Sequence, residues 1–248
     1  MLGWRARIGV LVPPGNPTVE PELYRMVPDG VSLHFARMES PPSAGPPGGA
    51  DGMEQRTRAY REGLDGPTRA LGQVRPAVVV LAHTASSYAL GWGREQLLAD
   101  RVASLAGAPA LLAAHAVHAA LQHWGVKRIA LGTPYPESIS RQGKAYWEAA
   151  GYEIVGYHRL ADVQDIYAES EERAYLLARQ ADAREAQVVL LSGTGLPTVS
   201  VLETLERDLG KRVISSNQAC LWRALRLAGV REAVPGFGRL LREPGTDA

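Results

Sequence analysis

Five short polar stretches of this chain contain residues that could act together on a ligand. They are "PPGN" (13–16), "HTASS" (83–87), "TPYPES" (133–138), "SGTGLPT" (192–198) and "SSNQ" (215–218). They supply amides, hydroxyls and one imidazole, but few charged side chains. Neutral donors of this kind, together with the free N–H groups of helix N-termini, suit a small anion such as a carboxylate. We therefore expect a carboxylate-binding site if the fold brings these stretches together.

The elements around these stretches predict how they are positioned. Apolar runs of strand length alternate with longer helical patterns, which favours an α/β fold with parallel sheets and right-handed crossovers. In such sheets, ligands bind beyond the carboxyl ends of the strands. The Pro/Gly-rich stretch 40–52 is predicted to be a loop that leads into a helix near 53–74. Strands are predicted at 7–12, 31–38, 77–82, 109–113, 128–133, 153–160, 188–192 and 212–215.

The two halves of the chain resemble each other. The run from Val78 to Thr84 aligns with the run from Val188 to Thr194, and "RI" at 7–8 aligns with "RI" at 128–129. We therefore expect two pseudo-symmetric Rossmann-like units, each with a four-stranded parallel sheet, and the site between them. The first unit is expected to comprise 1–118 plus 219–248, and the second 119–218. His83 and Gly193 then occupy equivalent positions, each at the end of its strand.

Composition narrows the range of partners and locations. The net charge is +1 and the basic residues form no long run, so we expect neither nucleic acid nor a membrane as partner. The apolar run near the N-terminus, "IGVLV", is too short for a signal peptide or a membrane span, which favours a cytoplasmic location. The single cysteine, Cys220, lies in an apolar helical pattern and is predicted to be a buried structural thiol.

No cofactor or metal ion is expected from the motifs. The "GTG" at 193–195 lacks the third glycine and the spacing of a dinucleotide site. His115 and His118 are spaced for one helix face, but no carboxylate partner for a metal site is evident. His115 could be a second polar contact of the site, although a half-buried helix position suits it better, as it does His118 and His123.

The motifs, taken in order, resemble those of the aspartate/glutamate racemase superfamily, and most closely its maleate cis–trans isomerase and arylmalonate decarboxylase branch. The match covers nearly the whole chain. It rests on "RIGVLVPPGNPTVEPEL", "HTASSYALG", "ALGTPYPESI", "LLSGTGL", "LETLERDLG", "VISSNQACLWRALRLAG" and "VPGFGRLLR". The resemblance implies the same two-unit fold, with the substrate carboxylate held between the units, no cofactor, and a homo-oligomer.

The family's chemistry uses cysteines at two pseudo-symmetric positions, which here are His83 and Gly193. Racemases use both as a pair of bases, maleate isomerases add one to the alkene, and the decarboxylases keep only the second, as a proton donor. Neither cysteine is present in this chain. His83 is the predicted catalytic residue because imidazole can act as an acid or a base near neutral pH, although it could instead only donate a hydrogen bond to a carboxylate or cap a helix.

The resemblance also implies a set of substrate-binding residues and a wall around them. Tyr88 is expected to line the pocket, and Leu196 and Pro197 could press on a departing carboxylate. Asn217 could equally be a helix cap. The predicted binding residues are Asn16, Thr84, Ser86, Tyr135, Gly193, Thr194, Gly195 and Asn217.

Two functions of different classes fit this sequence. The first is a cofactor-independent enzyme, a decarboxylase or an isomerase, that acts on a small carboxylate or dicarboxylate through an enediolate-type intermediate. The second is a binding or accessory protein, for example of the kind linked to ectoine utilisation, that holds a dicarboxylate without chemistry. Turnover that depends on His83 would distinguish them.

Overall fold

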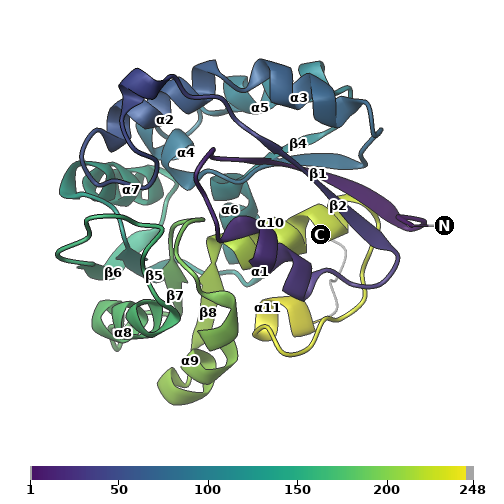
Figure 1. Ribbon diagram of the computed structural model, residues 1–248. Helices are drawn as coiled ribbons and strands as arrows, with labels where there is room; N and C mark the ends of the chain where they lie inside the picture. Colours follow the sequence, from purple (N-terminus) through teal and green to yellow (C-terminus); the bar gives the residue numbers. More distant parts are fainter. Residues whose placement is uncertain (1, 244–248) are drawn as a thin grey trace.

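Two four-stranded parallel sheets form the frame of the protein in the computed structural model, which describes residues 2–243 (Figure 1). The strand orders are β2-β1-β3-β4 and β6-β5-β7-β8, so the two halves share one topology. This confirms the predicted fold class. Residue 1 and residues 244–248, which the expected first unit includes, lie outside the described residues. The strands are β1 (Ala6–Val12), β2 (Val31–Arg37), β3 (Val78–Leu81), β4 (Ala110–Leu112), β5 (Arg128–Thr133), β6 (Glu153–Arg159), β7 (Val188–Leu191) and β8 (Arg212–Ser215).

The inner strands of each sheet read as unbroken apolar runs. All four residues of β3 and all four of β7 are buried, as expected for parallel strands covered on both faces. Because β1 and β3 pair in parallel, as do β5 and β7, the loops that follow these strands emerge at the carboxyl edges of their sheets. Strand direction therefore gathers the polar stretches at one edge of each sheet, and the packing of the two units brings the two edges together.

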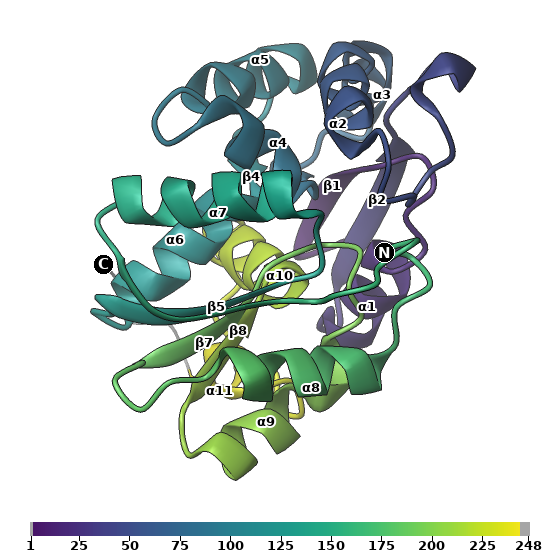
Figure 2. The same ribbon diagram turned by 90° about the vertical axis from the view of Figure 1, so that its left-hand side faces the viewer.

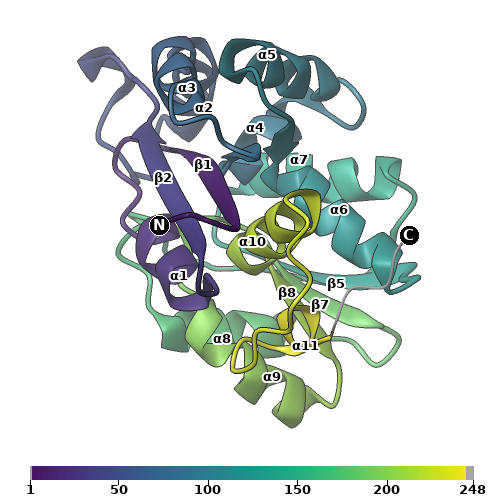
Figure 3. The same ribbon diagram turned by 90° about the vertical axis from the view of Figure 1, so that its right-hand side faces the viewer.

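Helices cover both faces of each sheet. The helices α3 and α5 pack on the outer face of the first sheet, and α8 and α9 on the outer face of the second, while α6 and α10 lie between the sheets (Figures 2 and 3). The helices are α1 (Val19–Met26), α2 (Met53–Glu62), α3 (Asp65–Gly72), α4 (Thr84–Leu90), α5 (Gln96–Ala106), α6 (Ala113–His123), α7 (Glu137–Ala149), α8 (Glu171–Ala181), α9 (Leu202–Leu209), α10 (Ser216–Leu227) and α11 (Arg239–Arg242), with 3-10 turns at Pro42–Ala44 and Val199–Val201.

One buried apolar cluster joins the two units. It runs from Val80 of β3 through Ala116 of α6 and Leu221 of α10 to Ile129 of β5. The two sheets therefore share one core. Cys220 lies in this cluster, and burial raises the pKa of its thiol to about 12, so it is the unreactive buried thiol that the sequence predicts.

The predicted helix near 53–74 is wrong in its length, because the chain forms α2 and α3 with a break at Gly63. There the backbone of Gly63 pairs with that of Glu39, and a Cβ atom on Gly63 would lie 2.3 Å from the Glu39 carbonyl oxygen. Only glycine permits this approach. The break bends the chain after α2 and fixes the start of the loop at 40–52.

Tyr88 of α4 connects the first unit to the second. Its ring packs directly on the backbone of Gly143 in α7, where an added Cβ atom would be 2.7 Å away. Its hydroxyl accepts a 2.8 Å hydrogen bond from Nε1 of Trp147 and shares another with Oγ of Ser192. Both partners are buried. Tyr88 therefore links the two units and supports Ser192, the residue just before Gly193. It does not line the cavity described below.

The variant Tyr88→Phe tests whether the hydrogen bonds of the Tyr88 hydroxyl stabilise the protein. It keeps the ring but leaves Nε1 of Trp147 and Oγ of Ser192 buried without that partner. We expect the free energy of unfolding, measured by urea denaturation, to fall by about 1–3 kcal/mol. The control is Tyr157→Phe, whose tyrosine is 38% exposed and should change stability by less than about 0.5 kcal/mol. Equal stability of the two variants would contradict the role of the hydroxyl.

Candidate functional site

A small cavity lies between the two units, at the carboxyl ends of their strands. Of the residues predicted for the site, it brings together Asn16, His83, Tyr135, Thr194 and Gly195. Its volume is about 20 Å³, which is room for about one water molecule. A dicarboxylate is larger than this space, so we expect the lining to adjust when one binds. The remaining lining residues are Gly48, Met53, Arg56, Tyr60, Ile166 and Tyr167.

Asn16 offers the cavity a free donor. Its Oδ1 accepts the backbone N–H groups of Thr18 and Val19, at 2.8 and 3.1 Å, and so caps the start of α1. This bonding leaves the Nδ2 group buried, with no hydrogen-bond partner among the described residues. A buried amide without a partner is costly, and a ligand oxygen in the cavity would satisfy it.

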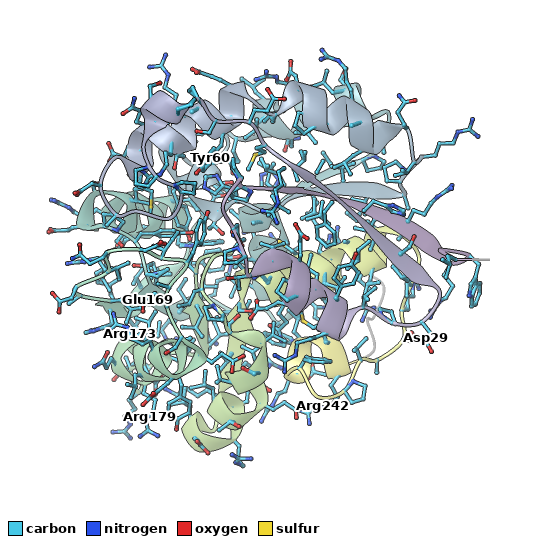
Figure 4. The ribbon with its side chains drawn as sticks, in the orientation of Figure 1. Asp29, Tyr60, Glu169, Arg173, Arg179 and Arg242 are labelled. Carbon is cyan, nitrogen blue, oxygen red and sulfur yellow. The ribbon has the colours of Figure 1, made fainter. Side chains whose placement is uncertain are left out.

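His83 stands at the N-cap position of α4 and faces the cavity. Its Nδ1 lies 2.8 Å from Oγ of Ser86, and the ring of Tyr60 packs edge-on against it at 5.3 Å between centroids. Figure 4 shows Tyr60 on the inner side of α2. Burial lowers the pKa of His83 to about 3, and the positive charge of Arg61 acts in the same direction. In the absence of a ligand, the imidazole is therefore neutral at physiological pH.

The second unit contributes the loop that follows β7. The hydroxyl of Thr194 donates to the Ala82 carbonyl at 2.9 Å, and the hydroxyl of Thr18 donates to the Gly195 carbonyl at 2.9 Å. Both bonds cross between the units. Within residues 2–243, the backbone N–H groups of Thr194 and Gly195 find no acceptor. They are available to an anion in the cavity.

Gly193 adopts a backbone conformation that favours glycine, with φ at +144°. A Cβ atom there would lie 3.0 Å from the Pro134 ring and 3.3 Å from the hydroxyl of Tyr135. Its N–H group donates to Oγ of Ser216 at 3.1 Å, and Ser216 also accepts from Thr84. Gly193 and Thr84 thus bond within the protein, outside the cavity lining.

A buried carboxylate holds this loop in place. Glu22 of α1 accepts the N–H groups of Thr198 and Val199 through Oε1, and Nδ2 of Asn217 through Oε2 at 2.6 Å. Asn217 also donates to the Thr194 carbonyl at 3.1 Å. Burial raises the pKa of Glu22, and these hydrogen bonds oppose the shift. The structure therefore places Asn217 beside the loop as a clamp, and not in the cavity lining.

Several other predicted residues lie away from the cavity. Ser86 contacts His83 and orients its ring. Leu196 is fully buried, and neither it nor Pro197 lines the cavity; Met53 and Ile166 form its apolar side instead. Nε2 of His115 pairs with the buried carboxylate of Glu95 at 3.3 Å, outside the cavity lining.

Arg56 is the main feature that sequence reasoning missed. It is buried in α2, and its guanidinium donates to the carbonyl groups of Ala44, Gly49 and Asp51 in the loop before α2. We call residues 44–52 the cover loop, because Gly48 within it lines the cavity. Among the lining residues in the described part of the chain, Arg56 alone carries a formal charge. A positive charge and neutral donors make the cavity suited to an anion.

Over residues 2–243, no three His, Cys, Asp or Glu side chains gather as a metal site would require. In the same range, no helix has the length and apolar character to cross a bilayer.

Comparison with known proteins identifies the family. The sequence profile of the arylmalonate decarboxylase family matches residues 8–241. The chain belongs to this family. Among its curated relatives, the maleate isomerase of Nocardia farcinica is 31% identical and the arylmalonate decarboxylase of Bordetella bronchiseptica is 30% identical. The first alignment covers 96% of each protein, and the second covers 95% of this chain and 96% of the relative.

Solved structures of the family have the same fold. A mutant of the maleate cis–trans isomerase of Nocardia farcinica, with a covalently bound succinylcysteine intermediate, superposes with a TM-score of 0.86 at 27% identity. The match covers 97% of this chain and 99% of the relative. The resemblance to the maleate isomerase and arylmalonate decarboxylase branch is thereby confirmed.

The lowered pKa of His83 predicts a pH dependence of stability. Below pH 6.5 the unfolded chain takes up a proton on His83 and the folded protein does not, so the free energy of unfolding falls as the pH falls. The expected slope from this group is about 1.4 kcal/mol per pH unit between pH 6 and 4. Urea denaturation of the wild type and of His83→Gln should show curves that converge as the pH falls. Parallel curves would contradict a buried neutral imidazole.

The variant Arg56→Met tests the support of the cover loop. It removes the donors to three loop carbonyl groups while keeping most of the apolar stem. We expect hydrogen exchange of the amides in residues 44–52 to be at least about tenfold faster. The matched control is Arg58→Met on the same helix, whose side chain is 75% exposed and bonds only to the exposed Glu62. Unchanged exchange in Arg56→Met would show that the loop is held by other contacts.

Proposed function

We propose that this chain is an enzyme that acts on a small dicarboxylate through an enediolate-type intermediate, without a cofactor, and that its reaction is a decarboxylation or an isomerisation. The observation that carries the proposal is the donor set of the cavity. The lining contains Asn16, whose buried Nδ2 has no partner, together with Thr194, Gly195 and the cationic Arg56, and it contains no carboxylate. The family's relatives are named for reactions of maleate and of arylmalonates, which are small dicarboxylates.

The donors would act most strongly on the intermediate. In a decarboxylation, the bond between the α-carbon and one carboxyl group breaks, CO₂ leaves, and the electron pair moves into the remaining carboxylate as an enediolate. The second oxygen of that group then gains charge. Donors fixed in a water-poor cavity stabilise this charge without reorganisation. Met53 and Ile166 contribute apolar side chains to the lining, where a departing carboxylate would lose its hydration.

His83 is the proposed proton carrier. The free imidazole is neutral, because burial lowers its pKa to about 3. A dianion bound beside it raises that pKa again, since an opposite charge favours the protonated form. The substrate therefore brings a proton onto His83 from water, and the imidazolium gives it to the α-carbon of the enediolate. The balance is one dianion and one proton consumed, with CO₂ and one monocarboxylate formed.

The alternative function is a binding protein that holds a dicarboxylate without chemistry. The specific observation in its favour is that both positions where the family uses cysteine hold other residues, His83 and Gly193, while the single thiol is buried in α10. This alternative uses the same donors but no proton transfer. The experiment below separates the two.

The test is proton NMR in D₂O with malonate, methylmalonate, phenylmalonate and maleate. We expect turnover of at least one of them, with deuterium entering at carbon where a bond to hydrogen forms. His83→Gln should lower kcat by about 10²–10⁴-fold, the usual contribution of a general acid or base. Turnover unchanged in His83→Gln would overturn the role of His83, and binding without any turnover would favour the alternative.

A second variant isolates the binding donor. Asn16→Asp keeps the oxygen that caps α1 but replaces the free Nδ2 with a carboxylate oxygen. Because the new oxygen is buried without a donor, we expect the free energy of unfolding to fall by about 1–3 kcal/mol. In the folded variant, we expect dicarboxylate binding, measured by calorimetry, to be at least tenfold weaker. Together the two variants separate loss of chemistry from loss of binding.

A further inference from the structure

The side chain of Tyr167 fills much of the space that a substrate substituent would need. It belongs to the connection between β6 and α8, outside the motifs of the family resemblance. Its ring lies against glycines of both units. Cβ atoms added to Gly195 and Gly48 would lie 2.7 and 2.6 Å from the ring, and one on Gly15 would lie 3.4 Å from it. The ring therefore packs tightly on the backbone of Gly195 and Gly48, where a side chain would collide with it.

The connection that carries Tyr167 is fixed on the second unit. Oδ1 of Asp165 accepts the Tyr167 N–H group at 2.8 Å. Arg173 of α8 forms an ion pair with Glu169, and its guanidinium also donates to the Ala161 carbonyl at 3.0 Å. Figure 4 shows Glu169 and Arg173 close together at this connection. These contacts hold both ends of the segment without help from the cover loop.

The cover loop meets the same segment from the other unit. The Ala50 N–H group donates to the Gln164 carbonyl, and the Ile166 N–H group donates to the Gly48 carbonyl, both at 2.9 Å. Besides these two bonds, the segment is held by Asp165 and by the ion pair of Arg173, which both belong to the second unit. We expect these contacts to keep the ring of Tyr167 against Gly195 if the cover loop moves outward to admit a ligand.

The surroundings of Tyr167 are polar as well as tight. Its pKa is raised, first by burial and then by Tyr60, and the nearby charge of Arg56 opposes this shift. Tyr60, Arg56 and Tyr167 all line the cavity. A large apolar substituent would lose contact with water here and meet hydroxyl and guanidinium groups instead.

We propose that Tyr167 sets the substrate class of this site, by restricting the substituent on the α-carbon of the dicarboxylate to hydrogen, hydroxyl or methyl and excluding an aryl group. This inference rests on the proposed function, because it concerns the substrate of that same site. It separates this chain from a relative named for arylmalonates.

The experiment compares malonate, methylmalonate and phenylmalonate with the wild type, Tyr167→Ala and Tyr167→Phe. Binding is measured by calorimetry and turnover by NMR. We expect the wild type to bind phenylmalonate at least 100-fold more weakly than methylmalonate. In Tyr167→Ala, the ratio of the dissociation constants for phenylmalonate and methylmalonate should fall at least tenfold. Tyr167→Phe keeps the ring and should retain the wild-type ratio. Circular dichroism confirms that each variant is folded.

The binding measurements distinguish failure of the proposed enzymatic function from failure of the proposed role of Tyr167. If the wild type binds the compact dicarboxylates and turns over none of them, the proposed enzyme fails, while the ratios still decide the role of Tyr167. A ratio unchanged in Tyr167→Ala, or a wild type that accepts phenylmalonate as readily as methylmalonate, overturns the role of Tyr167. A wild type that binds none of the three overturns both.

Discussion

The carboxylate of Glu22 is the interaction on which the arrangement of the site depends. It is buried between the units and accepts three N–H donors from the second unit. A buried carboxylate is tolerated only when its oxygens are paired, so the second unit must place these donors accurately. The loop from 193 to 199 is fixed as a result, and with it the free N–H groups that face the cavity. The anion site is thus built around an anion of the protein itself.

Burial of the cavity lining explains why the proposed site needs few charged groups to bind an anion. The cavity is lined by buried donors and one guanidinium, and in such surroundings each hydrogen bond is stronger than in water. Burial also keeps the imidazole of His83 neutral in the absence of a ligand. In the proposed mechanism, binding of the dianion and protonation of His83 are therefore coupled.

The sequence was sufficient to predict the fold and about half of the cavity lining. Strand direction places the loops after β1 and β3 at one edge of the first sheet, and those after β5 and β7 at one edge of the second. The predicted positions of Asn16, Tyr135 and Thr194 follow from the apolar runs before them and from the expected facing of the two units. Arg56 and Tyr167 could not be predicted in this way. They reach the cavity through the cover loop and the connection before α8, whose paths depend on contacts between the units. Likewise, only the structure shows that Asn217 bonds to Glu22, since the two are far apart in the chain.

Gly193 limits which side chains the loop after β7 can carry. Its φ is +144°, its N–H group is bonded to Ser216, and an added Cβ atom would lie 3.0 Å from the Pro134 ring and 3.3 Å from the Tyr135 hydroxyl. A side chain at this position therefore requires a strained backbone and a shift of both neighbours. An engineered thiol at position 193 would need compensating changes at Pro134 and Tyr135, so the loops after β5 and β7 can change only together.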